Sequence, residues 1–187
     1  MSAIDIALFH WINRWPEGLS GLFVFLSEAT KHAPGRILFA VLTAILLAAS
    51  KTTRKASLLA LAAWPLADAF SGSLKDAIPF ERPCVALADV TLRVHKLTTF
   101  GTASSHAANM AAIATVFWIV TGWRGGVPWA IVAFLTGLSR IYVGVHFPSQ
   151  ICLGWLCGVL VGVIVANTWQ AFVWLRSKRS DAQVENG

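Results

Sequence analysis

The sequence predicts an all-α membrane protein, a bundle of six transmembrane helices in one domain. The 187 residues are 56% hydrophobic and only 13% charged, and their mean hydropathy is +0.64. Soluble domains have about 45–50% apolar and about 25% charged residues, so this chain lies outside the soluble range. Nine Trp and eleven Phe against a single Tyr suit a chain that lies in and beside lipid.

The apolar residues fall into runs that are each expected to form a helix. Crossing a hydrocarbon core of about 30 Å takes ~20 mostly apolar residues. Residues 4–15 are short and amphipathic, which predicts a helix in the membrane interface. The six predicted spans cover residues 19–30, 36–50, 56–74, 105–122, 127–145 and 150–175. We expect residues 1–175 to form one transmembrane domain and residues 176–187 a polar, disordered cytoplasmic tail.

Six spans would place both termini on one side of the membrane. The positive residues outside the candidate site favour that side, which the positive-inside rule assigns to the cytoplasm, so the loop 75–104 is expected outside. The net charge of +6 is scattered among the connections. Because nucleic-acid binding needs a basic face, no nucleic-acid partner is expected. Three cysteines are too few for a disulfide framework.

Five ionisable side chains gather at the ends of the predicted spans. They are Lys75, Arg82, His106, Arg140 and His146. Charged residues at membrane depth are costly and mark functional sites. In an alternating bundle these positions all fall on the same membrane face. Taken alone, each histidine would be interpreted as a structural residue. Because both lie at the same membrane face as three cations, a functional site is favoured.

These residue types suit phosphoryl transfer. Three cations neutralise the non-bridging oxygens of a phosphate, while one histidine attacks phosphorus and the other protonates the leaving oxygen. Ser104 and Ser105 begin a predicted helix, where free backbone N–H groups favour an anion. No acidic metal cage is visible, so neither a metal nor another cofactor is expected.

Three segments carry a family resemblance. Residues 75–83, KDAIPFERP, resemble the Lys-x6-Arg-Pro motif of the type 2 phosphatidic acid phosphatase (PAP2) superfamily, and residues 103–106, ASSH, resemble its Pro-Ser-Gly-His motif. Ser139 and Arg140, followed by His146 and Gln150, resemble its Ser-Arg-x5-His-x3-Asp motif. The resemblance implies a helical PAP2 core and a lipid phosphatase. The superfamily also includes soluble vanadium haloperoxidases, but the apolar spans select the membrane branch.

The resemblance also implies a role for each matched residue. His146 would be the nucleophile that forms a phosphohistidine, and His106 the general acid toward the lipid. The residues implied to hold the phosphate are Lys75, Arg82, Ser104, Arg140 and the backbone amide of Ser105.

Gln150 is the main departure, because the family has Asp where this chain has an amide. Gln accepts a hydrogen bond from the nucleophilic histidine but brings no negative charge, so reduced activity is expected. An acid recruited from elsewhere would be an alternative, with Asp68 and Asp89 as candidates.

The small size indicates the bacterial branch of the superfamily, hence a multi-pass protein of the inner membrane with its site facing the periplasm or exterior. Residues 8–13 and 23–28 resemble the bacitracin-resistance type of undecaprenyl-diphosphate phosphatase. Phosphatidylglycerophosphate, phosphatidic acid and lipid A 1-phosphate stay open as substrates. So do two other activities: a lipid phosphotransferase and a low-activity lipid-phosphate binder.

Three further features have more than one interpretation. Glu28 suits either substrate binding or a hydrated interface. Gly154, Gly158 and Gly162 suit packing within the bundle at least as well as dimerisation, so the oligomeric state stays open. His95 suits a solvated loop better than a lipid head-group contact.

Overall fold

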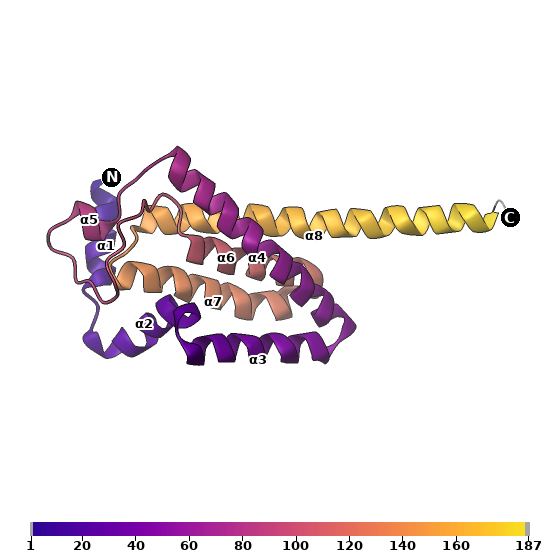
Figure 1. Cartoon of the computed structure of the whole chain (residues 1–187), viewed down its shortest axis with the longest axis horizontal. Helices are drawn as coiled ribbons and strands as arrows, with labels where there is room; N and C mark the ends of the chain where they lie inside the picture. The colour runs from indigo at the N-terminus through magenta and orange to yellow at the C-terminus, as the bar shows by residue number, and fades with distance from the viewer. Residues whose placement is uncertain (1, 186–187) are drawn as a thin grey trace.

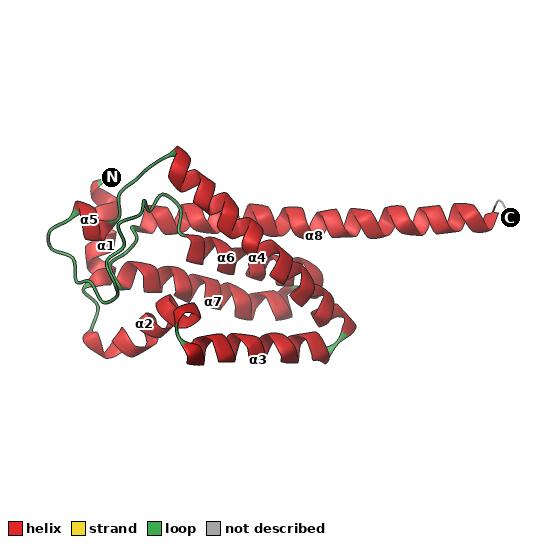
Figure 2. Ribbon diagram, viewed as in Figure 1, coloured by secondary structure: helices red, strands yellow, loops and turns green. Residues whose placement is uncertain are grey.

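The computed structural model describes residues 2–185 as helices and loops, without a strand in that range (Figure 2). The long helices are α3 (Ala33–Ala49), α4 (Lys51–Ala77), α6 (Ser105–Thr121), α7 (Trp123–Tyr142) and α8 (Pro148–Glu185). The shorter ones are α1 (Ala3–Asn13), η1 (Glu17–Leu19), α2 (Ser20–Glu28), η2 (Ala29–Lys31) and α5 (Pro83–Ala86). The all-α prediction is confirmed, and each predicted run forms a helix.

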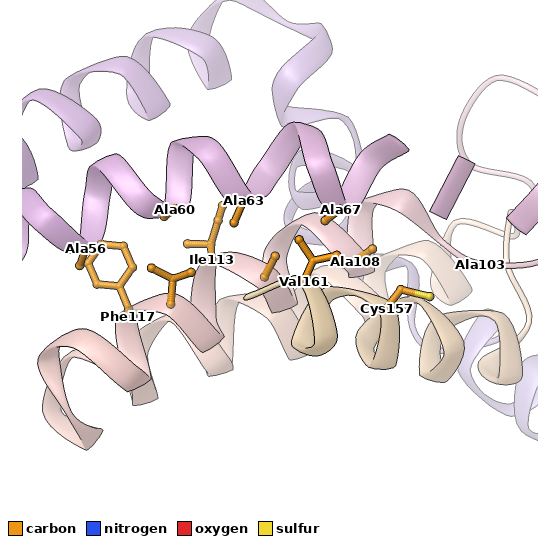
Figure 3. Close-up of a cluster of buried hydrophobic side chains, with 12 residues drawn as sticks. Ala56, Ala60, Ala63, Ala67, Ala103, Ala108, Ile113, Phe117, Cys157 and Val161 are labelled. Carbon is orange, nitrogen blue, oxygen red and sulfur yellow. The ribbon is translucent and has the colours of Figure 1, made fainter. Parts of the chain in front are cut away.

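Helix α6 lies at the centre of the bundle, packed against α4, α7 and α8 (Figure 1). Its close approach to α4 follows from a ladder of alanines on one face of α4, formed by Ala56, Ala60, Ala63 and Ala67. Figure 3 shows these small side chains facing the buried residues of α6 and α8. In lipid, helices associate through close packing, which small residues permit.

The glycine stripe of α8 serves the same packing. A Cβ on Gly158 would collide with the carbonyl oxygen of Ala108, and one on Gly162 would lie 2.7 Å from Cβ of Thr115. Both contacts are on α6 of the same chain. The stripe is therefore accounted for by packing within the bundle.

Helix α1 is anchored at the end of the bundle where α7 ends and α8 begins. The carboxylate of Asp5 accepts hydrogen bonds from the backbone N–H and the hydroxyl of Ser149, at 2.9 and 2.7 Å. Asn13 Nδ2 donates to the carbonyl oxygens of Thr91 and Tyr142, each at 2.9 Å. These buried contacts place α1 beside the start of α8.

Helix α1 and the far end of α8 therefore lie at opposite ends of the bundle (Figure 1). The expectation that both termini share one face is wrong. Segments Glu17–Lys31 and Ala33–Ala49 meet at an angle of 76° at a short break, as in a broken span or a re-entrant loop. Nine residues of α2 are too few to cross a bilayer by themselves, so these segments do not form the two separate spans expected from the sequence.

Among residues 2–185, two helices are long and apolar enough to cross a membrane, α4 and the Pro148–Arg179 part of α8. The number of candidate spans rises to three if the bent pair counts as one. Six spans are not confirmed. Helix α3 presents Ile37, Val41 and Ile45 outward, each at least half exposed, at the spacing of one helix face. Such an exposed apolar stripe suits contact with lipid, and the chain is a membrane protein.

The predicted disordered tail differs from the structure. Helix α8 continues through Arg176 without a break and ends at Glu185. The polar residues beyond Leu175 lie on an extension of the same helix, which projects from the bundle (Figure 1). Backbone hydrogen bonding propagates from a helix already formed, so a polar sequence does not by itself end it. Residues 186 and 187 of the predicted tail lie outside the described residues.

Candidate active site

His146 lies in the short connection between α7 and α8, and its side chain is buried. The chain reaches it through Gly144, whose φ of +89° turns the backbone directly after α7. The backbone N–H of His146 donates to the carbonyl oxygen of Arg140, which closes this turn at 3.2 Å. The turn therefore points the imidazole into the end of the bundle.

Gln150 determines which nitrogen of His146 carries the proton. Nδ1 of His146 lies 3.0 Å from Oε1 of Gln150, which also accepts from the backbone N–H of Phe147 at 3.2 Å. The other amide atom, Nε2, donates to the carbonyl oxygen of Glu81 at 2.8 Å. These two backbone contacts fix Oε1 as an acceptor, so Nδ1 must be the donor. The neutral ring then has its lone pair on Nε2.

Arg82 faces that lone pair. Its Nη1 donates to Nε2 of His146 at 2.6 Å and to the carbonyl oxygen of Val145 at 3.1 Å. Nε and Nη2 donate to the carbonyl oxygens of Thr99 and Phe100, at 2.7 and 3.1 Å. Burial, and next the positive charge of Arg82, hold the pKa of His146 well below its usual range. The ring is therefore neutral at neutral pH, and its Nε2 lone pair accepts the hydrogen bond from Arg82.

Gly101 makes this arrangement possible. A Cβ at this position would lie 2.7 Å from Oε1 of Gln150 and 2.8 Å from Cγ of Arg82. Only a residue without a side chain fits between them. The sequence does not single out Gly101, because a glycine in a long loop does not show that Gln150 and Arg82 pack against it.

The start of α6 brings Ser104, Ser105 and His106 to the same end of the bundle. Ser104 is the N-cap, its hydroxyl accepting from the N–H of Ala107 at 3.4 Å, and its own N–H donates to the carbonyl oxygen of Gln150 at 3.0 Å. The hydroxyl of Ser105 accepts from Nζ of Lys75 at 2.5 Å. The ends of α4, α6 and α8 thus meet at the predicted site.

A sequence model of the PAP2 superfamily matches residues 55–174, from α4 to α8. The chain belongs to the PAP2 superfamily. The match includes all three motif segments named above, together with the helices that carry them.

Relatives of this PAP2 chain include phosphatases of polyprenyl lipids. It is 30% identical to an undecaprenyl-diphosphatase of Sulfolobus acidocaldarius over 82% of this chain and 73% of that one. It is 31% identical to the decaprenylphosphoryl-5-phosphoribose phosphatase of Mycobacterium tuberculosis over 75% of each chain. The crystal structure of Aquifex aeolicus LpxE superimposes with a TM-score of 0.72 at 29% identity, over 89% of this chain and 96% of that one. The chain is a phosphatase.

Arg140 of the PAP2 site is held from the broken N-terminal passage. Its Nη1 donates to the hydroxyl and the carbonyl oxygen of Ser27, at 2.5 and 3.1 Å, and lies 3.4 Å from Oε1 of Glu28. Glu28 is also paired with Lys31, at 2.7 Å. Glu28 is therefore a buried partner of Arg140, not a hydrated interface residue. The sequence does not place Lys31 at the site, because Lys31 reaches Glu28, the partner of Arg140, only through the break between α2 and α3.

An apolar cavity of about 630 Å³ ends at the site of this PAP2 protein. His106 and Ser105 line it together with Ala29 and Thr30 of η2, and its wall is otherwise mainly apolar. The apolar lining residues include Phe25, Leu38, Phe39, Leu42, Leu61, Trp64, Met110 and Val132. A lipid tail suits such a wall, because burying its methylenes removes them from water.

Other titratable residues lie away from His146. Asp89 is paired with Arg14 at 3.0 Å, and Asp68 accepts from Nδ2 of Asn109 at 3.3 Å on the cavity wall. Neither carboxylate replaces the family Asp beside His146, because Gln150 itself occupies that position. Within residues 2–185, no three of His, Cys, Asp and Glu lie together as metal ligands would.

Proposed function

We propose that this PAP2 protein removes the terminal phosphate of a polyprenyl diphosphate, with undecaprenyl diphosphate as the first candidate, through a phosphohistidine on His146. The observation that carries the proposal is the pairing of Nδ1 of His146 with Gln150, which leaves Nε2 directed at Arg82. A phosphate that takes over the Nη1–H of Arg82 would therefore release the lone pair of Nε2 and lie directly against it.

The reaction takes two steps. Nε2 of His146 forms a bond to the terminal phosphorus while the bond from that phosphorus to the bridging oxygen breaks. His106 gives its proton to the bridging oxygen, and the lipid monophosphate leaves. Water then attacks the phosphohistidine and loses a proton to His106. Inorganic phosphate is released, and both histidines return to their starting states.

The phosphate-binding residues divide into two groups in this proposal. Lys75, Arg82 and Arg140 supply positive charge to the non-bridging oxygens, which gain charge in the transition state. Ser105 contributes its backbone N–H at the start of α6, where the positive end of the helix dipole favours an anion. The backbone N–H of Ser104 already donates to the carbonyl oxygen of Gln150, so Ser104 is proposed to bind through its hydroxyl, which accepts as the N-cap and keeps its own O–H for a phosphate.

The apolar cavity beside His106 supports a lipid substrate, and the two polyprenyl-lipid phosphatases among the relatives support an isoprenoid tail. We also propose that the site faces the periplasm or exterior of a bacterial inner membrane. Lys51, Arg54, Lys55, Arg124 and the basic residues after Leu175 lie at the opposite end of the bundle, as the positive-inside rule requires of a cytoplasmic face.

The decisive experiment is a phosphate-release assay with the purified full chain in detergent. The lipids are undecaprenyl diphosphate, phosphatidylglycerophosphate, phosphatidic acid and lipid A 1-phosphate. We expect release to be fastest from the polyprenyl diphosphate and to be abolished by His146→Ala and His106→Ala. Exposed His95 provides a matched control, since His95→Ala should retain the wild-type rate.

Two outcomes would contradict the proposal. Faster phosphate release from another lipid would assign a different substrate. If none of the four lipids released phosphate although the protein bound them, the chain would be a lipid-phosphate binder. Acid-labile phosphate on His146 in rapidly quenched protein would support the intermediate. Transfer of phosphate to an added alcohol without free phosphate would indicate a phosphotransferase.

A further inference from the structure

Lys31 and Glu28 form an ion pair that the proposed reaction does not yet use. Both lie at the break between α2 and α3, where η2 ends at Lys31. The Glu28 side chain is 10% exposed and lies 2.7 Å from Nζ of Lys31 and 3.4 Å from Nη1 of Arg140. The Lys31 side chain is 45% exposed. One carboxylate therefore joins a buried cation of the site to an accessible one.

This pair lies on the side of the site where His106 lies. Ala29 and Thr30, which directly precede Lys31, line the same cavity as His106. Thr136, one turn before Arg140 on α7, lines this cavity as well. Arg82, by contrast, contacts His146. The cations thus divide between a nucleophile side and a leaving-group side.

We propose that Lys31 binds the leaving phosphate of a lipid diphosphate and so makes the enzyme prefer diphosphates to monophosphates. This inference rests on the proposed function. Nζ of Lys31 has three N–H donors, and Glu28 holds the ammonium without using all of them. The exposed part of the side chain leaves the remaining donor free to contact a ligand.

The difference between the two substrates lies in the group that leaves. With a diphosphate, the bridging oxygen takes the proton of His106 and becomes a hydroxyl of the lipid monophosphate, whose other oxygens keep their negative charge beside Lys31. With a monophosphate, the leaving oxygen belongs to a lipid alcohol, and the proton from His106 neutralises it completely. An extra cation therefore stabilises the first leaving group and gives little to the second.

Glu28 has a positioning role in this proposal. Its carboxylate holds the Lys31 ammonium near Arg140 before substrate binds, which lowers the cost of ordering a long side chain. It also offsets part of the charge of the two cations that it contacts, Lys31 and Arg140, so that a monophosphate is not held too tightly to be released.

The experiment compares a farnesyl diphosphate with farnesyl monophosphate, using wild-type protein, Lys31→Met and Lys31→Arg. Loss of one charge-assisted contact should lower kcat/KM for the diphosphate by about 10- to 100-fold in Lys31→Met. The monophosphate value should fall much less, so the ratio of the two falls about tenfold or more. Lys31→Arg should restore most of the ratio. Lys51→Met, an exposed site at the opposite end of the bundle, is the matched control.

A binding measurement separates failure of this inference from failure of the proposed function. We expect Lys31→Met to weaken binding of an inert methylene diphosphonate analogue of the lipid but to leave the corresponding monophosphonate nearly unchanged. Equal losses for both analogues, or none for either, would overturn the role of Lys31 whether or not hydrolysis occurs. Absence of phosphate release by wild-type protein from every lipid would instead contradict the proposed function.

Discussion

Gln150 accepts a hydrogen bond from Nδ1 of His146 through Oε1 at 3.0 Å and donates through Nε2 to the carbonyl oxygen of Glu81 at 2.8 Å. An amide suits this position because it faces a donor on one side and an acceptor on the other. A carboxylate in the same place would put two oxygens against each other at Glu81.

We therefore expect three substitutions of Gln150 to behave differently. Gln150→Asp, which is shorter and withdraws from Glu81, should raise turnover with little change in phosphate affinity, because its charge stabilises the imidazolium. Gln150→Glu should lower turnover, since its second oxygen faces the Glu81 carbonyl. Gln150→Leu should lower kcat by ~10²-fold or more, because the tautomer is no longer fixed. Steady-state phosphate release measures all three, and a Gln150→Leu protein as fast as wild type would remove Gln150 from this role.

Arg82→Lys should destabilise the protein as well as slow it. The guanidinium of Arg82 donates to the carbonyl oxygens of Thr99, Phe100 and Val145, and an ammonium cannot span all three. Each buried carbonyl left without a donor costs about 1–3 kcal/mol, so a total loss of ~3 kcal/mol is expected. Thermal unfolding in detergent would show it. Surface Arg54→Lys is the control, and an equal Tm for both variants would contradict the structural role of Arg82.

Gly101→Ala should reduce activity although Gly101 itself contributes no catalytic group. Its methyl would lie 2.7 Å from Oε1 of Gln150, so Gln150 or Arg82 must move. A misplacement of about 1 Å in a catalytic group costs about 10²-fold in rate. We expect kcat to fall by that order, with KM nearly unchanged. Gly72→Ala, in open space on α4, is the matched substitution and should retain the wild-type kcat.

Stability should decline on the acid side of neutrality because of His146. Its folded-state pKa lies below the usual 6.5, mainly through burial and then through Arg82. Between the two values, the unfolded chain binds a proton that the folded chain does not. The contribution of His146 to stability is therefore complete above pH 6.5 and is lost as pH falls through that value toward the folded pKa. Unfolding measurements from pH 7.5 to 4.5, with His146→Gln for comparison, test this, and an identical pH slope in both proteins would refute it.

The site could be predicted from sequence to the extent that it depends on where helices end. Lys75, His106 and Arg140 stand at the ends of apolar runs, and an alternating bundle brings such ends together whatever the packing details. The family and the phosphatase activity are confirmed. The assignment of individual roles to His146, His106 and Gln150 stays a prediction.

Other parts of the site could not be predicted because they depend on contacts between distant segments. Apolar periodicity is a local property, and it does not show that the segments Glu17–Lys31 and Ala33–Ala49 meet at 76°. Glu28 and Lys31 lie at this break, where Glu28 contacts Arg140. The helical continuation past Leu175 was also missed, because composition alone does not end a helix that is already formed.

By itself, the sequence determined that the chain is helical and lies in a membrane, and it predicted that two of its five histidines and three of its cations gather at one end, because hydrophobic runs and their spacing act within each segment. The tertiary structure alone decided which nitrogen of His146 carries the proton, that Arg82 faces the other nitrogen, and why Gly101 must lack a side chain. Those properties depend on directions and distances between atoms that are far apart along the chain, and only packing sets them.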